Sequence, residues 1–88
     1  MEVLVDRSFI RDVKKMPEPM QRLVDVIIQS IKKAKKISDI PKIKKLSGAK
    51  NAYRIRVEDY RLGFYIENQK LIVLSRFLPR KDIYGYFP

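Results

Sequence analysis

The first half of the chain carries apolar residues at helical spacing. A short alternating segment at 2–6 predicts a strand, and Ser8 can cap a short helix that follows it. Pro17 and Pro19 then interrupt the chain. A second helix is predicted over about 19–36, because its apolar residues form one stripe. That stripe consists of Met20, Leu23, Val24, Ile27, Ile28 and Ile31. The two helices should form a hairpin with one shared apolar side.

From Ala52 onward the apolar period changes to two, which is typical of strands with one buried face. Three alternating runs are separated by the turn residues Glu58-Asp59 and Asn68-Gln69, so they predict a three-stranded antiparallel meander. One face of this meander should be apolar and should lie against the helical hairpin. The residues predicted on that face are Tyr53, Ile55, Val57, Tyr60, Leu62, Phe64, Ile66, Leu71, Val73 and Phe77.

The remaining segments are a basic connection at 37–50 and a short tail at 79–88. The whole pattern predicts one α+β domain over residues 1–88. In this fold an N-terminal strand and a two-helix hairpin pack on one face of a twisted antiparallel sheet of about four strands.

Two-residue turns would align three arginines across the meander. Arg56 would face Arg61, and Arg61 would face Arg76, with Arg54 and Tyr65 on the same side of the sheet. Like charges at opposite positions destabilise a sheet by up to about 1 kcal/mol, so such a row suggests that an anion binds there. Guanidinium groups suit phosphate because they offer planar, paired donors. The alternative is that these arginines are solvated, or paired with acids such as Glu2, Glu58 and Glu67.

Charge supports a polyanionic partner. Lys+Arg number 20 against 10 Asp+Glu, a formal charge of +10. Residues 31–50 alone hold eight lysines against one acid, Asp39. Such a block attracts phosphate backbones, although lysine is also the common solvated surface cation. Charge favours a nucleic acid but does not separate DNA, RNA and the ribosome. If the partner is RNA, the residues expected to contact it are Lys42, Lys44, Lys45, Lys50, Tyr65 and Lys81.

Two missing residue types restrict the chemistry. The chain has no Cys, which excludes disulfide scaffolds, thiolate zinc sites and cysteine nucleophiles. It has no His, which excludes every triad built on imidazole. No run approaches the roughly 20 apolar residues of a membrane span, and the N-terminus has no signal-peptide core. We therefore expect a cytoplasmic protein that needs no metal or cofactor.

The segments YRIRVEDYRLGFY and LSRFLPRKDIYGYF resemble the RelE/ParE superfamily of bacterial and archaeal toxins. The order of elements is also similar along almost the whole chain. This resemblance implies the RelE-like microbial RNase fold. It also implies a toxin of a type II toxin–antitoxin system, neutralised by a small RelB-like antitoxin.

RelE-type toxins enter the ribosomal A site and cleave mRNA through attack of a ribose 2′-hydroxyl on the adjacent phosphate. The resemblance implies catalytic roles for six residues here: Arg54, Arg56, Arg61, Arg76, Arg80 and Tyr84. The antitoxin would cover exposed parts of the helical hairpin and the tail aromatics Tyr84, Tyr86 and Phe87. Its binding segment should be acidic, complementing the lysine block.

The chain departs from the family pattern at two places. Some relatives have Lys where Arg54 and Arg56 stand, and arginine is a poor general base. Related toxins often carry His at the position of Pro79, which leaves Tyr84, Tyr65 and Lys45 as candidates for proton transfer. Two alternatives therefore stay open. One is a gyrase-directed, ParE-like toxin, and the other is an RNA-binding RelE homologue whose catalysis is weakened by Pro79.

Overall fold

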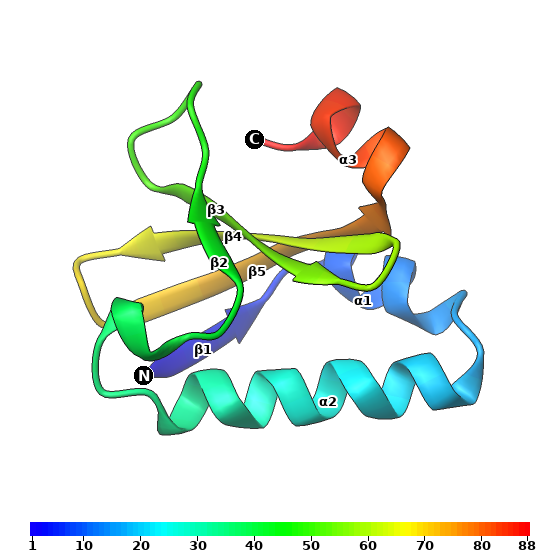
Figure 1. The fold of residues 1–88 in the computed structure, drawn as a ribbon, viewed down its shortest axis with the longest axis horizontal. Helices are drawn as coiled ribbons and strands as arrows, with labels where there is room; N and C mark the ends of the chain where they lie inside the picture. The colour runs from blue at the N-terminus through cyan, green and yellow to red at the C-terminus, as the bar shows by residue number, and fades with distance from the viewer.

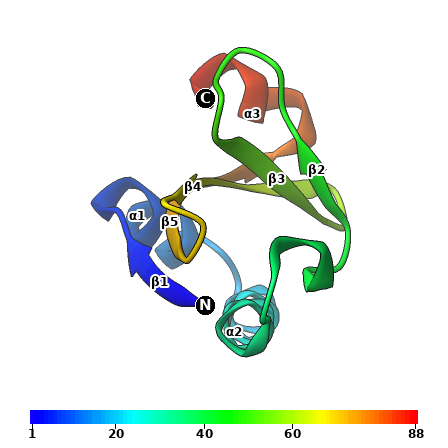
Figure 2. The ribbon, with the colours of Figure 1, turned by 90° about the vertical axis from the view of Figure 1, so that its left-hand side faces the viewer.

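One five-stranded sheet organises the molecule (Figure 1). The computed structural model describes residues 1–88. The elements in chain order are β1 (Glu2–Val5), α1 (Arg7–Lys14), α2 (Glu18–Lys33), the 3-10 turn η1 (Ile37–Asp39), β2 (Ile43–Lys45), β3 (Ala52–Val57), β4 (Tyr60–Glu67), β5 (Leu71–Pro79) and α3 (Arg80–Tyr86). The strand order is β1-β5-β4-β3-β2. Helix α2 runs along one face of the sheet, and α3 lies on the other side (Figures 1 and 2).

The predicted α+β class and helical hairpin are confirmed, and the sheet differs in two details. It has five strands rather than about four, and β1 pairs with β5 in parallel rather than antiparallel fashion. The additional strand β2 lies in the segment predicted as a connection. Its three residues, between Pro41 and Gly48, are too few to show a strand period.

The helices begin and end close to the predicted positions. Helix α1 begins at Arg7 after Asp6, so Ser8 is not its cap. The Ser8 hydroxyl instead donates a hydrogen bond of 2.6 Å to the carbonyl of Ser75 in β5. Helix α2 begins at Glu18, directly after Pro17, and it contains Pro19 in its first turn, where a backbone N–H has no partner within the helix. It ends at Lys33, three residues earlier than predicted.

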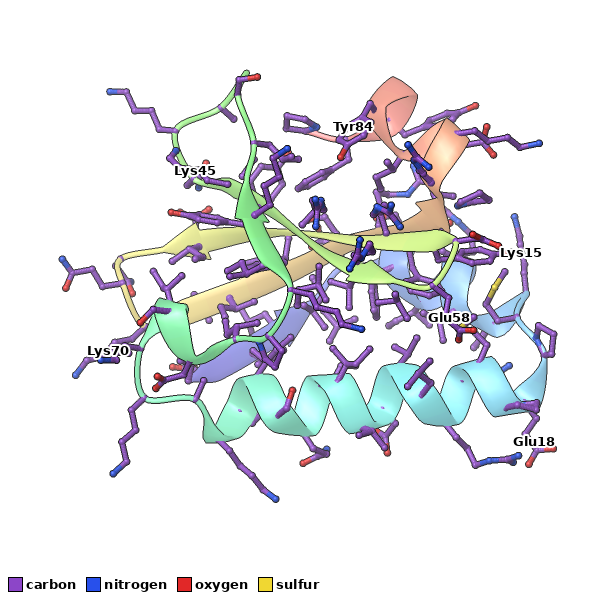
Figure 3. All side chains as sticks on the ribbon, viewed as in Figure 1. Lys15, Glu18, Lys45, Glu58, Lys70 and Tyr84 are labelled. Atoms are coloured by element: carbon purple, nitrogen blue, oxygen red, sulfur yellow. The ribbon has the colours of Figure 1, made fainter.

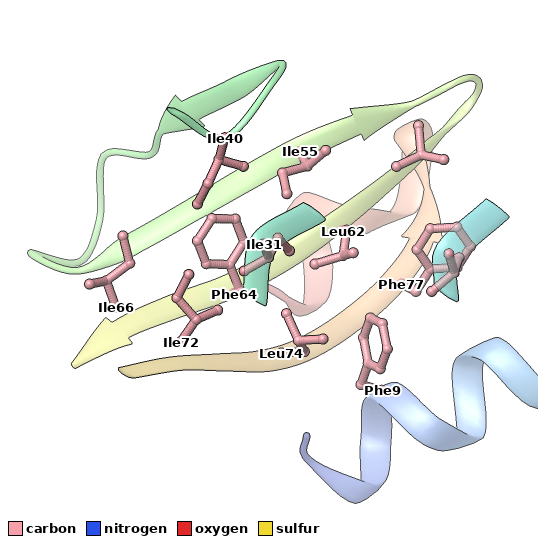
Figure 4. Packing of buried hydrophobic residues seen from close by; sticks show 12 residues of the cluster. Phe9, Ile31, Ile40, Ile55, Leu62, Phe64, Ile66, Ile72, Leu74 and Phe77 are labelled. Carbon is pink, nitrogen blue, oxygen red and sulfur yellow. The ribbon is translucent and has the colours of Figure 1, made fainter. Parts of the chain in front are cut away.

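The main core lies between the helical hairpin and the sheet (Figure 4). Phe9 of α1 meets Phe77 of β5 edge to face, with ring centroids 6.3 Å apart. Val24 and Ile31 of α2 are almost completely buried against the strands. Burial of each such side chain contributes about 1.5–3 kcal/mol, so this layer holds the sheet in place beneath the site.

The register between β4 and β5 differs from the predicted one. Three residues, not two, connect the strands, because Glu67 pairs with Leu71. This shift turns Ile72 and Leu74 to the main core, so the predicted core positions of Leu71 and Val73 are wrong. A β-bulge at Ser75 then inserts one residue and returns Phe77 to the core face.

A second, smaller core lies on the opposite face of the sheet. It joins Leu46 and Ala52, near β2 and β3, to Ile83 of α3 and to Phe87. The segment predicted as a simple tail is therefore a packed helix followed by a buried aromatic residue. This helix covers part of the sheet face that was expected to be open. None of the helices is long and apolar enough to cross a bilayer.

Candidate nucleic-acid interface

The β3–β4 hairpin places two arginines directly opposite each other. Arg56 pairs with Arg61 in the strand register, as predicted from the two-residue turn. Arg56 is exposed, whereas the Arg61 residue is only 8% exposed. Nη1 of Arg61 donates to the carbonyls of Glu58, at 3.0 Å, and Tyr60, at 2.8 Å. These bonds fix the guanidinium and leave its Nε and Nη2 without an acceptor in the protein.

Arg54 lies on the same face of β3, opposite Gly63. Its Nη1 donates a hydrogen bond of 3.2 Å to the carbonyl of Lys42. Its Nε is buried and has no acceptor in the protein. A buried unsatisfied donor costs about 1–3 kcal/mol. An anionic oxygen bound on this face would remove that cost, so the geometry of Arg54 favours an anion site.

Helix α3 brings Arg80 and Tyr84 to the same region. The backbone N–H of Arg80 donates a 2.7 Å bond to the carbonyl of Asp59, so the β3–β4 turn fixes the start of the helix. Tyr84 is 57% exposed, and nitrogen-bearing side chains gather between it and the sheet (Figure 3). A shallow pocket lies at this end of α3, lined by Asp59, Pro79, Arg80, Lys81 and Tyr84.

The electrostatics of Arg61 show that these side chains share one environment. Burial lowers the pKa of its guanidinium, and the charges of Arg54, Arg80 and Arg56 lower it further. The interaction with Tyr84 raises the pKa of Arg61. None of the four arginines forms an ion pair with an acid, including Glu58. We call Arg54, Arg56, Arg61, Arg80 and Tyr84 the arginine cluster. Its charge is uncompensated by the protein, which suits a phosphate ligand.

Arg76 lies apart from this cluster. The predicted alignment with Arg61 is wrong, because the altered turn and the bulge place Arg76 opposite Gly63. The Arg76 guanidinium donates to both carboxylate oxygens of Asp12 in α1, at 2.8 and 3.1 Å. The bond to Asp12 raises the pKa of Arg76. The guanidinium also lies 5.2 Å from the ring centroid of Tyr86. Arg76 thus connects α1, β5 and α3.

The predicted RNA-contacting lysines are divided between several positions. Lys44 pairs with Arg54, so it shares the face of the arginine cluster. Lys45 pairs with Tyr53 on the other face, lies 5.6 Å from that ring centroid, and donates to the carbonyl of Lys50. The remaining lysines are exposed, two beside β2 and one in α3; these are Lys42, Lys50 and Lys81.

Tyr65, also predicted to contact RNA, is half-buried. Its ring centroid lies 5.0 Å from that of Phe87. Phe87 is only 2% exposed, so the prediction that it forms part of an exposed aromatic surface is wrong. Tyr86, at 67% exposed, remains available with Tyr84.

Three residues have structural roles near the site that the sequence did not predict: Asp12, Gly63 and Phe87. Asp12 looked like a polar residue of an amphipathic helix, and only the tertiary structure pairs it with Arg76. Gly63 did carry a signal, since a glycine inside a strand often marks a close approach of another segment. The structure contains no group of three or more acidic, His or Cys side chains that could hold a metal ion.

The family model described as the ParE toxin of the type II toxin–antitoxin system parDE matches residues 3–84. A curated relative, Toxin RelE3 from Methanocaldococcus jannaschii, is 38% identical over 89 residues, covering all of both chains. These matches extend over nearly the whole chain and include the β3–β4 hairpin and α3.

Solved structures of RelE proteins share the fold of this chain. The toxin chain of the RelB–RelE antitoxin–toxin complex from Methanococcus jannaschii matches with a TM-score of 0.79 and 35% identity, over 97% of this chain and 99% of that one. The archaeal RelE–RelB complex from Pyrococcus horikoshii matches with a TM-score of 0.73 and 19% identity, over 93% and 97%. The isolated Escherichia coli RelE toxin shares the fold, with a TM-score of 0.63 and 15% identity over 89% of this chain and 82% of that one.

Proposed function

Because this chain belongs to the ParE toxin family of type II toxin–antitoxin systems and is RelE-like, we propose that it is a ribosome-dependent mRNA endoribonuclease. The observation that carries the proposal is the arginine cluster, in which four guanidiniums without an acidic partner lie in one electrostatic environment with the phenol of Tyr84. A phosphate in the RNA backbone is a natural ligand for such a group of donors.

The proposed reaction is attack of a ribose 2′-hydroxyl on the adjacent phosphate, which gives a 2′,3′-cyclic phosphate and a free 5′-hydroxyl. Negative charge grows on the phosphoryl oxygens as the new bond forms. Arg61 is held rigidly by two carbonyls, with two nitrogens left to donate to those oxygens. Donors that are fixed before the reaction stabilise the transition state without reorganisation.

Tyr84 is the residue we propose as the general acid: its hydroxyl protonates the 5′-oxygen as the bond between phosphorus and that oxygen breaks, and water takes up the proton that the 2′-hydroxyl releases. Arginine keeps its proton under physiological conditions and is a poor base. Of the other candidates, Tyr65 packs against Phe87, and Lys45 donates to the carbonyl of Lys50. Only the Tyr84 phenol is both exposed and electrostatically coupled to Arg61. The ribosome would orient the mRNA so that the 2′-hydroxyl and phosphate lie in line.

A RelB-like antitoxin is the proposed protein partner, because the archaeal structures that resemble this chain are RelB–RelE complexes. Its binding surface would include the exposed apolar side chains. Those are Leu4, Val5, Ile10, Val26, Tyr84 and Tyr86. An antitoxin segment that covers Tyr84 would also block the arginine cluster.

Primer-extension mapping of mRNA on translating ribosomes, with the purified protein added, tests the proposal. The expected result is a set of cuts at the A-site codon that disappears when ribosomes are omitted. Intact mRNA with a stalled ribosome would instead support the second candidate, an RNA-binding homologue without cleavage, which the absence of imidazole favours. Unaffected translation together with inhibited supercoiling by DNA gyrase would support a gyrase-directed toxin.

A further inference from the structure

Helix α3 is too short to be stable without packing against the rest of the protein. It has seven residues, no side-chain hydrogen bond at its N-cap, and a glycine, Gly85, inside it. Isolated helices shorter than about 12–15 residues are marginal in water, so packing must fix the helix. Arg80 and Tyr84 therefore depend on whatever anchors α3 to the sheet.

The start of α3 is anchored by the backbone bond from Arg80 to Asp59. Its end is anchored by the buried Phe87 ring, which packs with Ile83 of α3 in the second core. The Phe87 N–H donates a 2.8 Å bond to the carbonyl of Ile83 and so links this ring to the last turn of the helix. Tyr84 lies between these two anchors. A shift of Phe87 would move Tyr84 relative to Arg61, whereas the N-terminal anchor would stay in place.

The Phe87 ring packs directly against the backbone of Gly63 in β4. Gly63 stands in the middle of the arginine face, between Arg54 of β3 and Arg76 of β5. It is a site of close approach, because a Cβ on Gly63 would lie 2.6 Å from Cδ2 of Phe87 and 2.8 Å from two further ring atoms. No real Cβ contact is that short, so any side chain at position 63 must displace the ring. Tyr65 also packs against the Phe87 ring, and the centroids of the two rings are 5.0 Å apart.

We propose that Phe87, packed on Gly63, is a positioning residue of the proposed nuclease site: it sets where α3 holds Tyr84 relative to Arg61. This inference rests on the proposed function and adds to it a residue without contact to the RNA. The ring and the glycine act as one unit, so their effects on cleavage must be coupled.

Gly63→Ala is the direct test, and Gly85→Ala is its matched control, because a Cβ at Gly85 meets nothing within 4 Å. Gly63→Ala should lower the cleavage rate at saturating ribosome by about 10- to 100-fold, as a misplacement near 1 Å does. The KM for programmed ribosomes should change little, because the lysines and arginines still bind. Gly85→Ala should cleave like the parent chain. Cleavage by a folded Gly63→Ala protein at the parental rate would overturn the proposal.

A double variant with a larger residue at position 63 and a smaller one at position 87 distinguishes a positioning role from a general loss of stability. Phe87→Leu alone should reduce cleavage, and adding it to Gly63→Ala should raise cleavage above that of Gly63→Ala, because the smaller side chain makes room for the methyl group. Losses that simply multiply in the double variant would contradict the coupling. Circular dichroism and thermal unfolding confirm that each variant is folded, and Phe87→Leu keeps the test decisive if Gly63→Ala does not fold.

Hydrogen exchange distinguishes failure of this inference from failure of the proposed function. The Phe87 amide should be protected in the parent chain and in Gly85→Ala, and should exchange faster in Gly63→Ala. Normal packing of α3 without any cleavage by the parent chain would defeat the proposed function alone. Cleavage by the parent chain with an unprotected Phe87 amide would defeat the positioning role alone.

Discussion

Asp12 of α1 accepts hydrogen bonds from Nε and Nη2 of Arg76, at 2.8 and 3.1 Å, and from the backbone N–H of Phe77, at 2.9 Å. The Asp12 side chain is 5% exposed, so this carboxylate is almost fully removed from water. The pair joins the helical hairpin to β5 at the edge that β1 leaves free. An arginine that looked like a phosphate ligand is therefore used to hold the fold together.

The Asp12–Arg76 pair should contribute strongly to stability. Asp12→Ala removes the acceptor from a charged guanidinium and from a buried N–H, so the free energy of unfolding should fall by about 1.5–3 kcal/mol. Urea unfolding at neutral pH measures this change. Asp25→Ala, on the exposed side of α2, is the control and should be close to neutral.

Arg76 should also be dispensable for cleavage. Arg76→Ala should retain cleavage at temperatures where the protein stays folded, because its guanidinium is bound to Asp12 and not offered to the arginine cluster. A folded Arg76→Ala protein that no longer cleaves mRNA would show that Arg76 takes part in cleavage, which contradicts a purely structural role for its pair with Asp12.

The hydroxyl group of Tyr84 should contribute more to cleavage than its aromatic ring does. Tyr84→Phe should lower the cleavage rate by about 100-fold with little change in affinity for ribosomes, because it removes the proposed proton-transfer group alone. Tyr86→Phe is the matched control, since Tyr86 packs on Arg76 through its ring. Equal effects of the two substitutions in a single-turnover assay would argue against a role of the Tyr84 hydroxyl.

RNA binding should depend steeply on salt. The affinity for a single-stranded RNA oligonucleotide, followed by fluorescence anisotropy, should fall as a power of the salt concentration. Lys44→Ala should reduce the slope of log affinity against log salt by about 0.7, because Lys44 shares the face of Arg54. Lys32→Ala, at the end of α2, should leave the slope unchanged. The opposite pattern would place RNA on the helical side.

Pro79 should serve the fold rather than disable the site. It is the N-cap residue of α3, with φ −54° and ψ 149°, and it pairs with Tyr60 at the end of β5. Pro79→His should lower stability by about 0.5–1 kcal/mol through the freer unfolded chain and should not increase cleavage. Growth arrest that appears only in the Pro79→His variant would show that this proline had weakened catalysis.

The β3–β4 register was predictable because the two strands alternate clearly and the Glu58-Asp59 turn is unambiguous. The β4–β5 register was not. Residues 71–74 are all apolar, so Leu71 and Val73 fit the core pattern as well as Ile72 and Leu74 do. The choice depends on one residue in the turn and on the bulge at Ser75, whose hydroxyl donates to Asp6.

The strand residues of the arginine cluster could be predicted from alternation, whereas Arg80 and Tyr84 of α3 were implied only by the family resemblance. Arg54, Arg56 and Arg61 could be placed on one face from alternation alone. The second core could not be predicted, because Ile83 and Phe87 lie in a short segment with no clear period. Arg76 was placed wrongly because the turn and the bulge change the β4–β5 register. Its pairing with Asp12 was also not predictable, since the two residues are 64 positions apart in the chain.

In the proposed reaction, Arg61 stabilises the phosphate that is cleaved. Arg61→Ala and the control Arg22→Ala, on the exposed side of α2, should be compared in one ribosome-dependent mRNA cleavage assay, with circular dichroism to confirm the fold. We predict that Arg61→Ala lowers the cleavage rate by about 100- to 1,000-fold and that Arg22→Ala cleaves normally. A folded Arg61→Ala protein that cuts mRNA as fast as the parent chain would show that Arg61 does not stabilise the cleaved phosphate.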